Sequence, residues 1–366
     1  MKIRDFQLER YFAKYEFNVK HLLSPSDCET RPVGEILGLP GGEWRERLNS
    51  LPLSYTESRG NPGIIGALDA IYGVGNDGIV VGCPEELIFL FMNSFLDAGD
   101  RVVCLSPAYQ SLYELPRSIG CEVVLWKLTA SGGRWSLDRD ELKPLLKDRT
   151  KLLVVNFPHN PTGYMPTPEE FDMIGDLAEG SGAVVFSDEM YRGLELDAPR
   201  LPSFCGRENA VIMSGLSKGP GLPGLRTGWL ASKRHGLISS VLAMKDYTTI
   251  CNSGPGEVLA EAAIRNIDEL MERNRTILRA NAELAGKFFA GRPDLIEWIP
   301  PAGGTTAFPR LLDGNIEDLC RRAVGEKSLM VLPDSVFDAK DNRFRVGMGR
   351  LNFPEALGLF GELLEG

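Results

Sequence analysis

The alternation of two sequence textures between about residues 79 and 233 constrains the fold most. Short β-branched runs recur there, and longer stretches with the period of an amphipathic helix separate most of them. Continuous apolar strands joined through helices indicate an α/β fold with a mostly parallel central sheet, covered by helices on both faces. In such sheets ligands bind beyond the carboxyl ends of the strands. The predicted strands contain residues 79–81, 102–105, 123–125, 152–155, 184–186 and 210–213, and the clearest predicted helices are 85–96, 109–118 and 168–177.

The helical stretches carry recognisable start signals. Thr167 places a capping hydroxyl before Pro168, and two acids follow in the first turn. Ser136 precedes a second acid-rich segment, 137–142, which we expect to begin another helix. A long amphipathic stretch from residue 256 to about 289 is expected to bridge two domains.

After Pro293 the texture shifts to shorter elements, with two prolines at 300–301 and two glycines at 303–304 as loop signals. We therefore expect a large α/β domain over residues 40–290. A smaller α/β domain is expected to combine residues 1–39 with residues 291–366. The sequence contains no internal repeat and no low-complexity tract.

Charge and cysteine usage exclude several classes of partner. Lys and Arg total 40 against 50 Asp and Glu, a formal charge of −10, which argues against binding to a nucleic-acid backbone. Seven dispersed cysteines and three separated histidines favour a reducing compartment and give no metal site. Met1 leads directly into charged sequence, and the longest strongly apolar stretch, about 87–95, is too short to span a bilayer. We expect a cytoplasmic protein without a membrane partner.

Polar side chains follow three successive predicted strands. Asn160 lies in a turn after the 152–155 strand, Asp188 ends the next strand, and Lys218 follows the 210–213 strand, with Arg226 eight residues later. Taken singly, these residues fit a turn, a helix cap, a solvated lysine and an ion-pair partner. A parallel sheet would bring them to one edge. An amine for a Schiff base, an acid for the pyridine nitrogen and donors for a phosphate are the groups that pyridoxal 5'-phosphate requires.

Three motifs in this order resemble a known family: Asn-Pro-Thr-Gly at 160–163, Asp-x-x-Tyr at 188–191, and Ser-Lys at 217–218 with Gly-Leu-Arg-x-Gly-Trp at 224–229. The sequence resembles the class I/II aminotransferases, which are fold-type I enzymes dependent on pyridoxal 5'-phosphate. The resemblance runs from about Tyr55 to Asn352. It implies a homodimer that transfers an amino group between an α-amino acid and a 2-oxo acid by a ping-pong mechanism.

The resemblance assigns roles to residues near the cofactor ring. It implies that Lys218 forms the aldimine with the cofactor and moves the proton at the substrate Cα. Asp188 would pair with the pyridine nitrogen, where an opposite charge favours the charged form. Asn160 and Tyr191 would hydrogen-bond the ring oxygen. Tyr109 matches the aromatic residue that stacks on the ring.

Other matched positions concern the phosphate. Ser217 and Arg226 match phosphate ligands, and Cys83, Pro84 and Glu85 occupy the place of the phosphate-binding turn. In this turn the family commonly has a small residue followed by Ser or Thr, whereas Pro84 has no backbone N–H to donate. A second departure is a glycine at position 215, where the family often has a serine. Both departures predict a modified set of phosphate donors.

Two further assignments concern the substrate and the partner subunit. Arg345 matches the arginine that binds the substrate α-carboxylate as a fork, and Asn160 is also expected to bind the substrate. Arg343 and Arg350 flank it, and strand alternation alone does not choose among the three. The resemblance favours Arg345, and we expect Arg350 to form an ion pair. Tyr55 matches a tyrosine that reaches the partner subunit's phosphate.

Several alternatives stay open. The same residues support a carbon–sulfur β-lyase or a cyclase that modifies an amino acid, because the cofactor carries the chemistry. Segments 9–12 and 24–29 weakly resemble cyclising or biosynthetic members. A regulatory protein on this scaffold is disfavoured, since no basic DNA-binding module accompanies it. His159 is expected to be structural, and residues 12–34 are expected to cover the mouth of the site. The amino-acid specificity is not predicted.

Overall fold

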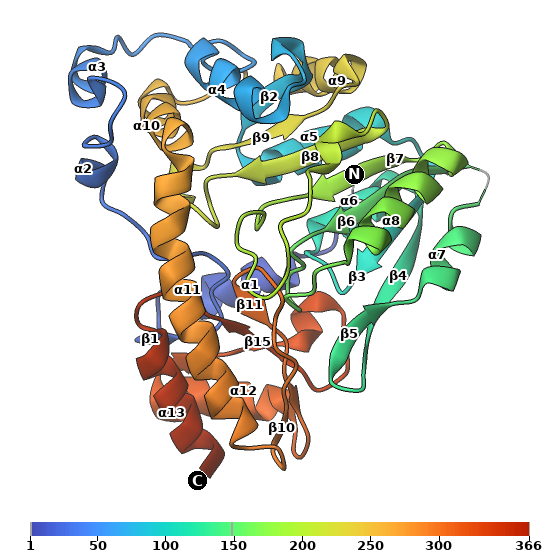
Figure 1. Cartoon of the computed structure of the whole chain (residues 1–366), viewed down its shortest axis with the longest axis vertical. Coiled ribbons are helices and arrows are strands. Elements are labelled where there is room, and N and C mark those ends of the chain that lie inside the picture. Colours follow the sequence, from blue (N-terminus) through green and yellow to red (C-terminus); the bar gives the residue numbers. More distant parts are fainter. Residues whose placement is uncertain (1, 148, 366) are drawn as a thin grey trace.

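The computed structural model describes residues 2–147 and 149–365, and an eight-stranded sheet forms its centre (Figure 1). The strand order is β2-β9-β8-β7-β6-β3-β4-β5. The pairs β3–β4, β3–β6, β6–β7 and β7–β8 are parallel, whereas β9 runs antiparallel to both of its neighbours and β5 runs antiparallel to β4. The strands are β2 (Ile79–Gly82), β3 (Arg101–Ser106), β4 (Glu122–Ser131), β5 (Arg134–Leu137), β6 (Thr150–Asn156), β7 (Val184–Asp188), β8 (Ala210–Gly215) and β9 (Gly228–Ala231).

Helices cover both faces of this sheet. On β3, Val102 and Cys104 join one buried cluster while Val103 and Leu105 join another, because successive side chains of a strand point to opposite faces. The predicted two-sided α/β sheet is therefore confirmed. One face packs against α5 (Pro84–Phe95), α6 (Ser111–Ile119) and α9 (His235–Lys245), and the other against α4 (Pro62–Tyr72), α7 (Arg139–Leu145), α8 (Pro168–Ser181) and α10 (Gly254–Arg265).

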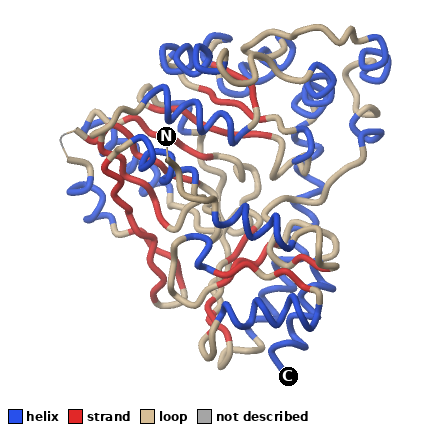
Figure 2. The backbone as a smooth tube through the Cα atoms, turned by 180° about the vertical axis from the view of Figure 1, so that it is seen from behind, coloured by secondary structure: helices blue, strands red, loops and turns tan. Residues whose placement is uncertain are grey.

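Elements from both ends of the chain form a second body, below the sheet in Figure 1 and again in the tube view of Figure 2. Here β1 pairs in parallel with β13, so that His21 faces Leu329. The division at residues 40 and 290 stays a prediction. The body contains α1 (Gln7–Tyr15), β1 (His21–Leu22), β10 (Ile296–Glu297), β11 (Thr306–Ala307), β12 (Arg310–Leu311), α12 (Ile316–Lys327), β13 (Leu329–Met330), β14 (Leu332–Pro333), β15 (Phe344–Gly347) and α13 (Phe353–Glu365).

Two helix starts differ from the expectation. The long amphipathic stretch is two helices, α10 and α11 (Ile267–Ala290), separated at Asn266. The Asn266 side chain donates to the carbonyls of Ala262 and Pro40, and this local bonding competes with a continuous helix. Similarly, α7 begins after Asp138, whose carboxylate caps the helix, because Ser136 still belongs to β5.

The longest helix, α11, runs 24 residues down one side of the molecule between the two bodies (Figure 1). Its buried positions alternate with charged ones, as in a helix with one face on a core. Across the part of the chain that the structure describes, no helix combines the length and apolarity that a bilayer crossing requires. The short helices α2 (Val33–Ile36) and α3 (Trp44–Ser50) pack against α10.

Candidate active site

The carboxyl ends of β6 and β7 are tied together by hydrogen bonds. Asn156 and Asp188 are direct partners in the sheet register, and the Asn156 amide donates to the Asp188 carbonyl at 2.9 Å. The Asn156 side-chain oxygen in turn accepts from the Asn160 backbone N–H at 2.8 Å. The turn that carries Asn160 is thus fixed relative to the strand that ends in Asp188. On the next strand Met213 faces Asp188, and Lys218 follows five residues later.

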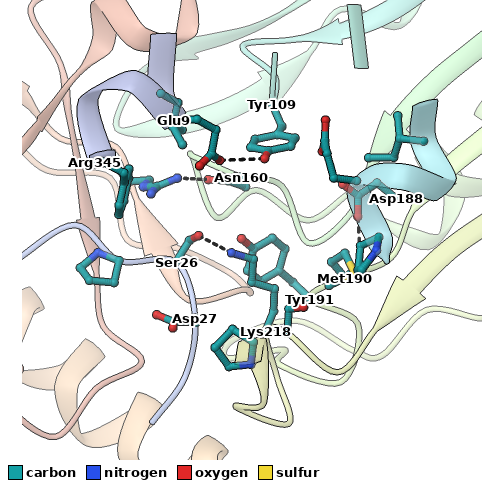
Figure 3. Close-up of a pocket in the computed structure, with 18 of the residues that line it drawn as sticks. Glu9, Ser26, Asp27, Tyr109, Asn160, Asp188, Met190, Tyr191, Lys218 and Arg345 are labelled. Carbon is teal, nitrogen blue, oxygen red and sulfur yellow. Dashed lines mark hydrogen bonds between the residues drawn. The ribbon is translucent and has the colours of Figure 1, made fainter. Parts of the chain in front are cut away.

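Beyond these strand ends lies a cavity of about 360 Å³ between the sheet and the second body (Figure 3). Its size lies within the ordinary range for a small-molecule site, roughly 300–1,000 Å³. Most of the residues predicted for the site line it. These are Pro84, Glu85, Tyr109, Asn160, Asp188, Tyr191, Ser217, Lys218, Arg226 and Arg345.

Two predicted site residues do not line this cavity. Tyr55 is 86% exposed, on the segment between α3 and α4. Cys83 lies just outside the wall, where its Sγ accepts a 3.3 Å hydrogen bond from Arg226 Nη2. Cys83 is also the N-cap residue of α5, so it adjoins the helix end that contributes Pro84 and Glu85.

The amine and the acid predicted for catalysis face the same space. Lys218 Nζ donates to Ser26 Oγ at 2.8 Å (Figure 3). Burial raises the pKa of Asp188 to about 7, while the Met190 backbone N–H and the charge of Lys218 act against that rise. A cation brought against this carboxylate lowers its pKa and favours the charged form. Asp188 therefore has the burial and the charge sensitivity of a partner for a pyridine nitrogen.

One end of the cavity has the donors that an anion needs. Ser217 is 6% exposed, and its hydroxyl has no hydrogen-bond partner among the described residues. The guanidinium of Arg226 and the first turn of α5 line the same cavity, and Arg226 donates to Cys83, the N-cap residue of that helix. A helix N-terminus with free backbone N–H groups, a hydroxyl and a guanidinium form a suitable phosphate site. Pro84 supplies no N–H, so the helix contributes through the residues after it.

The structure gives a physical reason for the glycine at position 215. Gly215 pairs with Gly228 across β8 and β9, and a Cβ on Gly215 would lie 3.0 Å from both the Gly228 Cα and the Thr227 carbonyl oxygen. The space that Gly228 leaves is filled from the other side by the Pro84 ring. The two departures from the family pattern, Pro84 and Gly215, therefore lie on either side of the same residue.

The three neighbouring arginines have different environments. Arg345 is 1% exposed, lines the cavity, and donates to the Ser24 carbonyl at 3.0 Å and to Asn160 Oδ1 at 3.2 Å. Arg343 is engaged elsewhere by Glu297. Arg350 forms a two-bond ion pair with Asp27, at 3.0 and 2.9 Å, which confirms the expected ion pair.

The buried His159 lies behind the cavity wall. Its Nδ1 is 2.7 Å from the Thr162 hydroxyl, and burial lowers its pKa to about 3. The imidazole is therefore neutral at physiological pH. His159 does not line the cavity, so the geometry agrees with a structural role.

The amino-terminal segment supplies much of the cavity mouth. Phe12, Glu16 and Ser26 line it, all within the segment expected to cover it. Glu9 lines the cavity as well and lies outside that segment. None of these residues was predicted as a site residue from a catalytic motif. The only available signal was the weak resemblance of segments 9–12 and 24–29 to biosynthetic members.

The residue set fits pyridoxal 5'-phosphate. The Ser217 hydroxyl, which has no partner in the described part of the chain, lines the same cavity as Lys218 and Asp188. A family model for class I and II aminotransferases matches residues 55–352. The chain belongs to this family, has its fold-type I architecture, and depends on pyridoxal 5'-phosphate.

Different relatives of this chain have different activities. Capreomycidine synthase of Streptomyces vinaceus is 32% identical over 94% of this chain and 88% of its own length. A pyridoxal-phosphate-dependent aminotransferase from Streptococcus suis superposes with a TM-score of 0.93 at 27% identity, covering 100% of this chain and 98% of that one. The pyridoxal-phosphate-dependent cyclase OrfR superposes at 0.91 with the same identity and coverage. Membership of the family therefore does not by itself define the reaction of this chain.

Proposed function

We propose that this protein is an aminotransferase that takes the amino group of an α-amino acid and passes it to a 2-oxo acid. The observation that carries the proposal is the presence of the buried Arg345 guanidinium in the same cavity as the Lys218 amine and the Asp188 carboxyl group. A buried guanidinium is suited to hold a carboxylate through two parallel hydrogen bonds. The substrate α-carboxylate would then be held on the opposite side of the cavity from the Asp188 carboxyl group.

The reacting groups follow from this placement. Pyridoxal 5'-phosphate supplies an electron sink for the bonds at the substrate Cα. Lys218 would hold the cofactor and, once released by the incoming amino acid, move the proton at Cα. Ser26 accepts a hydrogen bond from this amine and orients it. Asp188 would keep the pyridine nitrogen protonated.

The remaining residues would bind and orient. Ser217, Arg226 and the first turn of α5, at Pro84 and Glu85, would hold the phosphate, with Cys83 supporting the Arg226 guanidinium. On the ring side, Asn160 and Tyr191 would hydrogen-bond the ring oxygen. Tyr109 would stack against the ring.

We further propose a homodimer in which Tyr55 completes the partner's site. Two large apolar side chains of one extended segment, Leu53 and Tyr55, are 87% and 86% exposed. Exposed apolar residues gathered in one segment mark an interaction surface. Light scattering combined with an assay tests this proposal. An active monomer contradicts it.

A second candidate function is cyclisation or β-elimination. It is favoured by the 32% identity to capreomycidine synthase and by the likeness to the cyclase OrfR. The residues assigned above are compatible with this chemistry, because the cofactor stabilises the same charge at Cα in each reaction.

The dependence on an acceptor separates the candidates. The purified holoenzyme is incubated with a pool of amino acids, with and without 2-oxo acids, and the near-visible spectrum and the products are followed. A transaminase consumes amino acid beyond one equivalent only when a 2-oxo acid is present. Sustained conversion without an acceptor contradicts transamination. Release of ammonia then indicates a lyase, and a product that retains the nitrogen indicates a cyclase.

A further inference from the structure

The cavity is lined by more carboxylates than its own cations and the proposed cofactor can pair with. Two of its cations are already assigned: Arg350 is paired with Asp27, and Arg226 is proposed to hold the cofactor phosphate. In the function proposed above, Arg345 takes the α-carboxylate and Lys218 holds the cofactor. All the cations of the cavity are thereby assigned, whereas several carboxylates are not.

Two of these carboxylates belong to one face of α1. Glu9 lies in the helix and Glu16 is its C-cap residue, with Phe12 between them. The spacing of three, four and seven residues places all three on one side of a helix, and all three line the cavity. Glu9 accepts a 2.9 Å hydrogen bond from the Tyr109 hydroxyl. Within residues 2–147 and 149–365, neither Glu9 nor Glu16 has a cation within ion-pair distance.

The surroundings of Glu16 work against its charge. Burial raises the pKa of Glu16, and Asp27 and Glu9 raise it further, while Arg350 and Lys218 lower it. The charges of Asp27 and Glu9 therefore reach the Glu16 carboxyl group. Glu9 is exposed and Glu16 is half-buried where they line the cavity. Both carboxylates attract a ligand with a positive charge, and partial burial strengthens this attraction at Glu16.

Arg345, next to Glu9, independently indicates a ligand. Arg345 is 1% exposed and faces the same cavity, and its Nη2 has no hydrogen-bond partner in the described part of the chain. Figure 3 shows Glu9 and Arg345 on the same side of the cavity, with Asn160 beside them and Lys218 opposite. A ligand in this space would meet a guanidinium at one point and carboxylates at another.

We propose that the site selects amino acids with a cationic side chain, an ammonium or a guanidinium group, and that Glu9 and Glu16 are the residues that recognise it. The inference rests on the proposed function, in which Arg345 holds the α-carboxylate. A neutral side chain leaves the two carboxylates unneutralised, and an acidic one adds a third negative charge. The same wall therefore attracts one class of substrate and repels another.

Isosteric amino acids provide the test. L-arginine and L-citrulline differ in a guanidinium against a neutral ureido group, and L-lysine and L-norleucine differ in the terminal ammonium. Equilibrium binding of each to the holoenzyme is followed by the near-visible spectrum. We expect at least tenfold tighter binding of the cationic member in one pair, and that pair identifies the preferred cation. Equal affinities within both pairs, or tighter binding of the neutral members, overturn the proposal.

Variants assign the preference to α1. Glu9→Gln and Glu16→Gln should each reduce the ratio of cationic to neutral affinity at least threefold, with little change for the neutral member. Asp5→Asn is the matched control, because Asp5 is an exposed acid just before α1 that does not line the cavity. An unchanged ratio in both glutamate variants overturns the assignment.

The readout is binding, so the preference is measured whether the bound amino acid is transaminated or cyclised. Failure of every amino acid, L-alanine included, to change the spectrum contradicts the proposed function and this inference with it. Equal binding within the pairs contradicts this inference alone. The two failures are therefore distinguishable.

Discussion

Lys218 Nζ donates a 2.8 Å hydrogen bond to Ser26 Oγ, which joins two residues 192 positions apart. Lys218 follows β8 of the main sheet, whereas Ser26 belongs to the amino-terminal segment. The contact brings a segment that lines the cavity against the amine that we propose holds the cofactor. Replacement of Ser26 tests this contact directly.

Replacement of Ser26 should slow the chemical step. Ser26→Ala removes the acceptor that orients the Lys218 amine, and a hydrogen bond to a charged group contributes about 1.5–3 kcal/mol. We expect a roughly tenfold or larger fall in the single-turnover rate with an amino acid. Ser50→Ala, on exposed α3, is the control. Equal rates for Ser26→Ala and wild type contradict the role of Ser26.

Replacement of Arg345 should weaken recognition of the carboxylate alone. Arg345→Lys keeps the charge but loses the planar fork. We expect kcat/KM for amino acids to fall about a hundredfold, or about 2.7 kcal/mol. The bound cofactor's near-visible band should remain. An amine that lacks the α-carboxylate provides the comparison, and an equal loss for it would rule out carboxylate binding by Arg345.

Replacement of Gly215 by the serine that the family often has should lower the stability of the folded protein. A Cβ at Gly215 meets two backbone atoms at 3.0 Å, and such overpacking typically costs about 1–3 kcal/mol. We expect Gly215→Ser to lower the urea midpoint without tightening cofactor binding. Gly180→Ser is the matched control, since nothing lies within 4 Å of its Cβ. A Gly215→Ser variant as stable as wild type would contradict the packing argument.

His159 should make the fold sensitive to acid. Its pKa is about 3 in the folded protein against 6.5 for the free side chain. Between these values the unfolded chain binds the proton and the folded protein does not, so stability falls as pH falls from 6.5. The contribution is at most about 1.4 kcal/mol per pH unit.

Urea unfolding from pH 6.5 to pH 4.5 measures this sensitivity. His159→Gln should lose less stability over that range than wild type, because glutamine does not titrate. The quantity compared is the change in the free energy of unfolding with pH. A constant loss of stability from the missing contact with Thr162 does not affect that change. Parallel curves would show that His159 is not buried in its neutral form.

The sheet and the strand-end residues could be predicted because they depend on local pattern. Apolar runs indicated the strands, and Asn160, Asp188 and Lys218 lie at or shortly after the strand ends, so parallel pairing brings them to one edge. The break at Asn266 was not predicted, because it depends on one side chain that bonds the Pro40 carbonyl far away in the sequence.

The mouth of the site was only partly predictable for the same physical reason. Ser26 and Glu16 reach the cavity through packing of the amino-terminal segment against the carboxyl-terminal body. No local periodicity records such a contact. The reason for Gly215 also emerged only from the structure, where Gly228 and Pro84 share its space.

Chemical trapping determines whether Lys218 holds the cofactor in this cavity. The holoenzyme is reduced with borohydride and digested, and the lysine that carries the pyridoxyl group is located by mass spectrometry. We expect a single modified residue, Lys218, and no modification in Lys218→Ala. Modification at another lysine, such as the buried Lys245, or at none, would contradict this expectation.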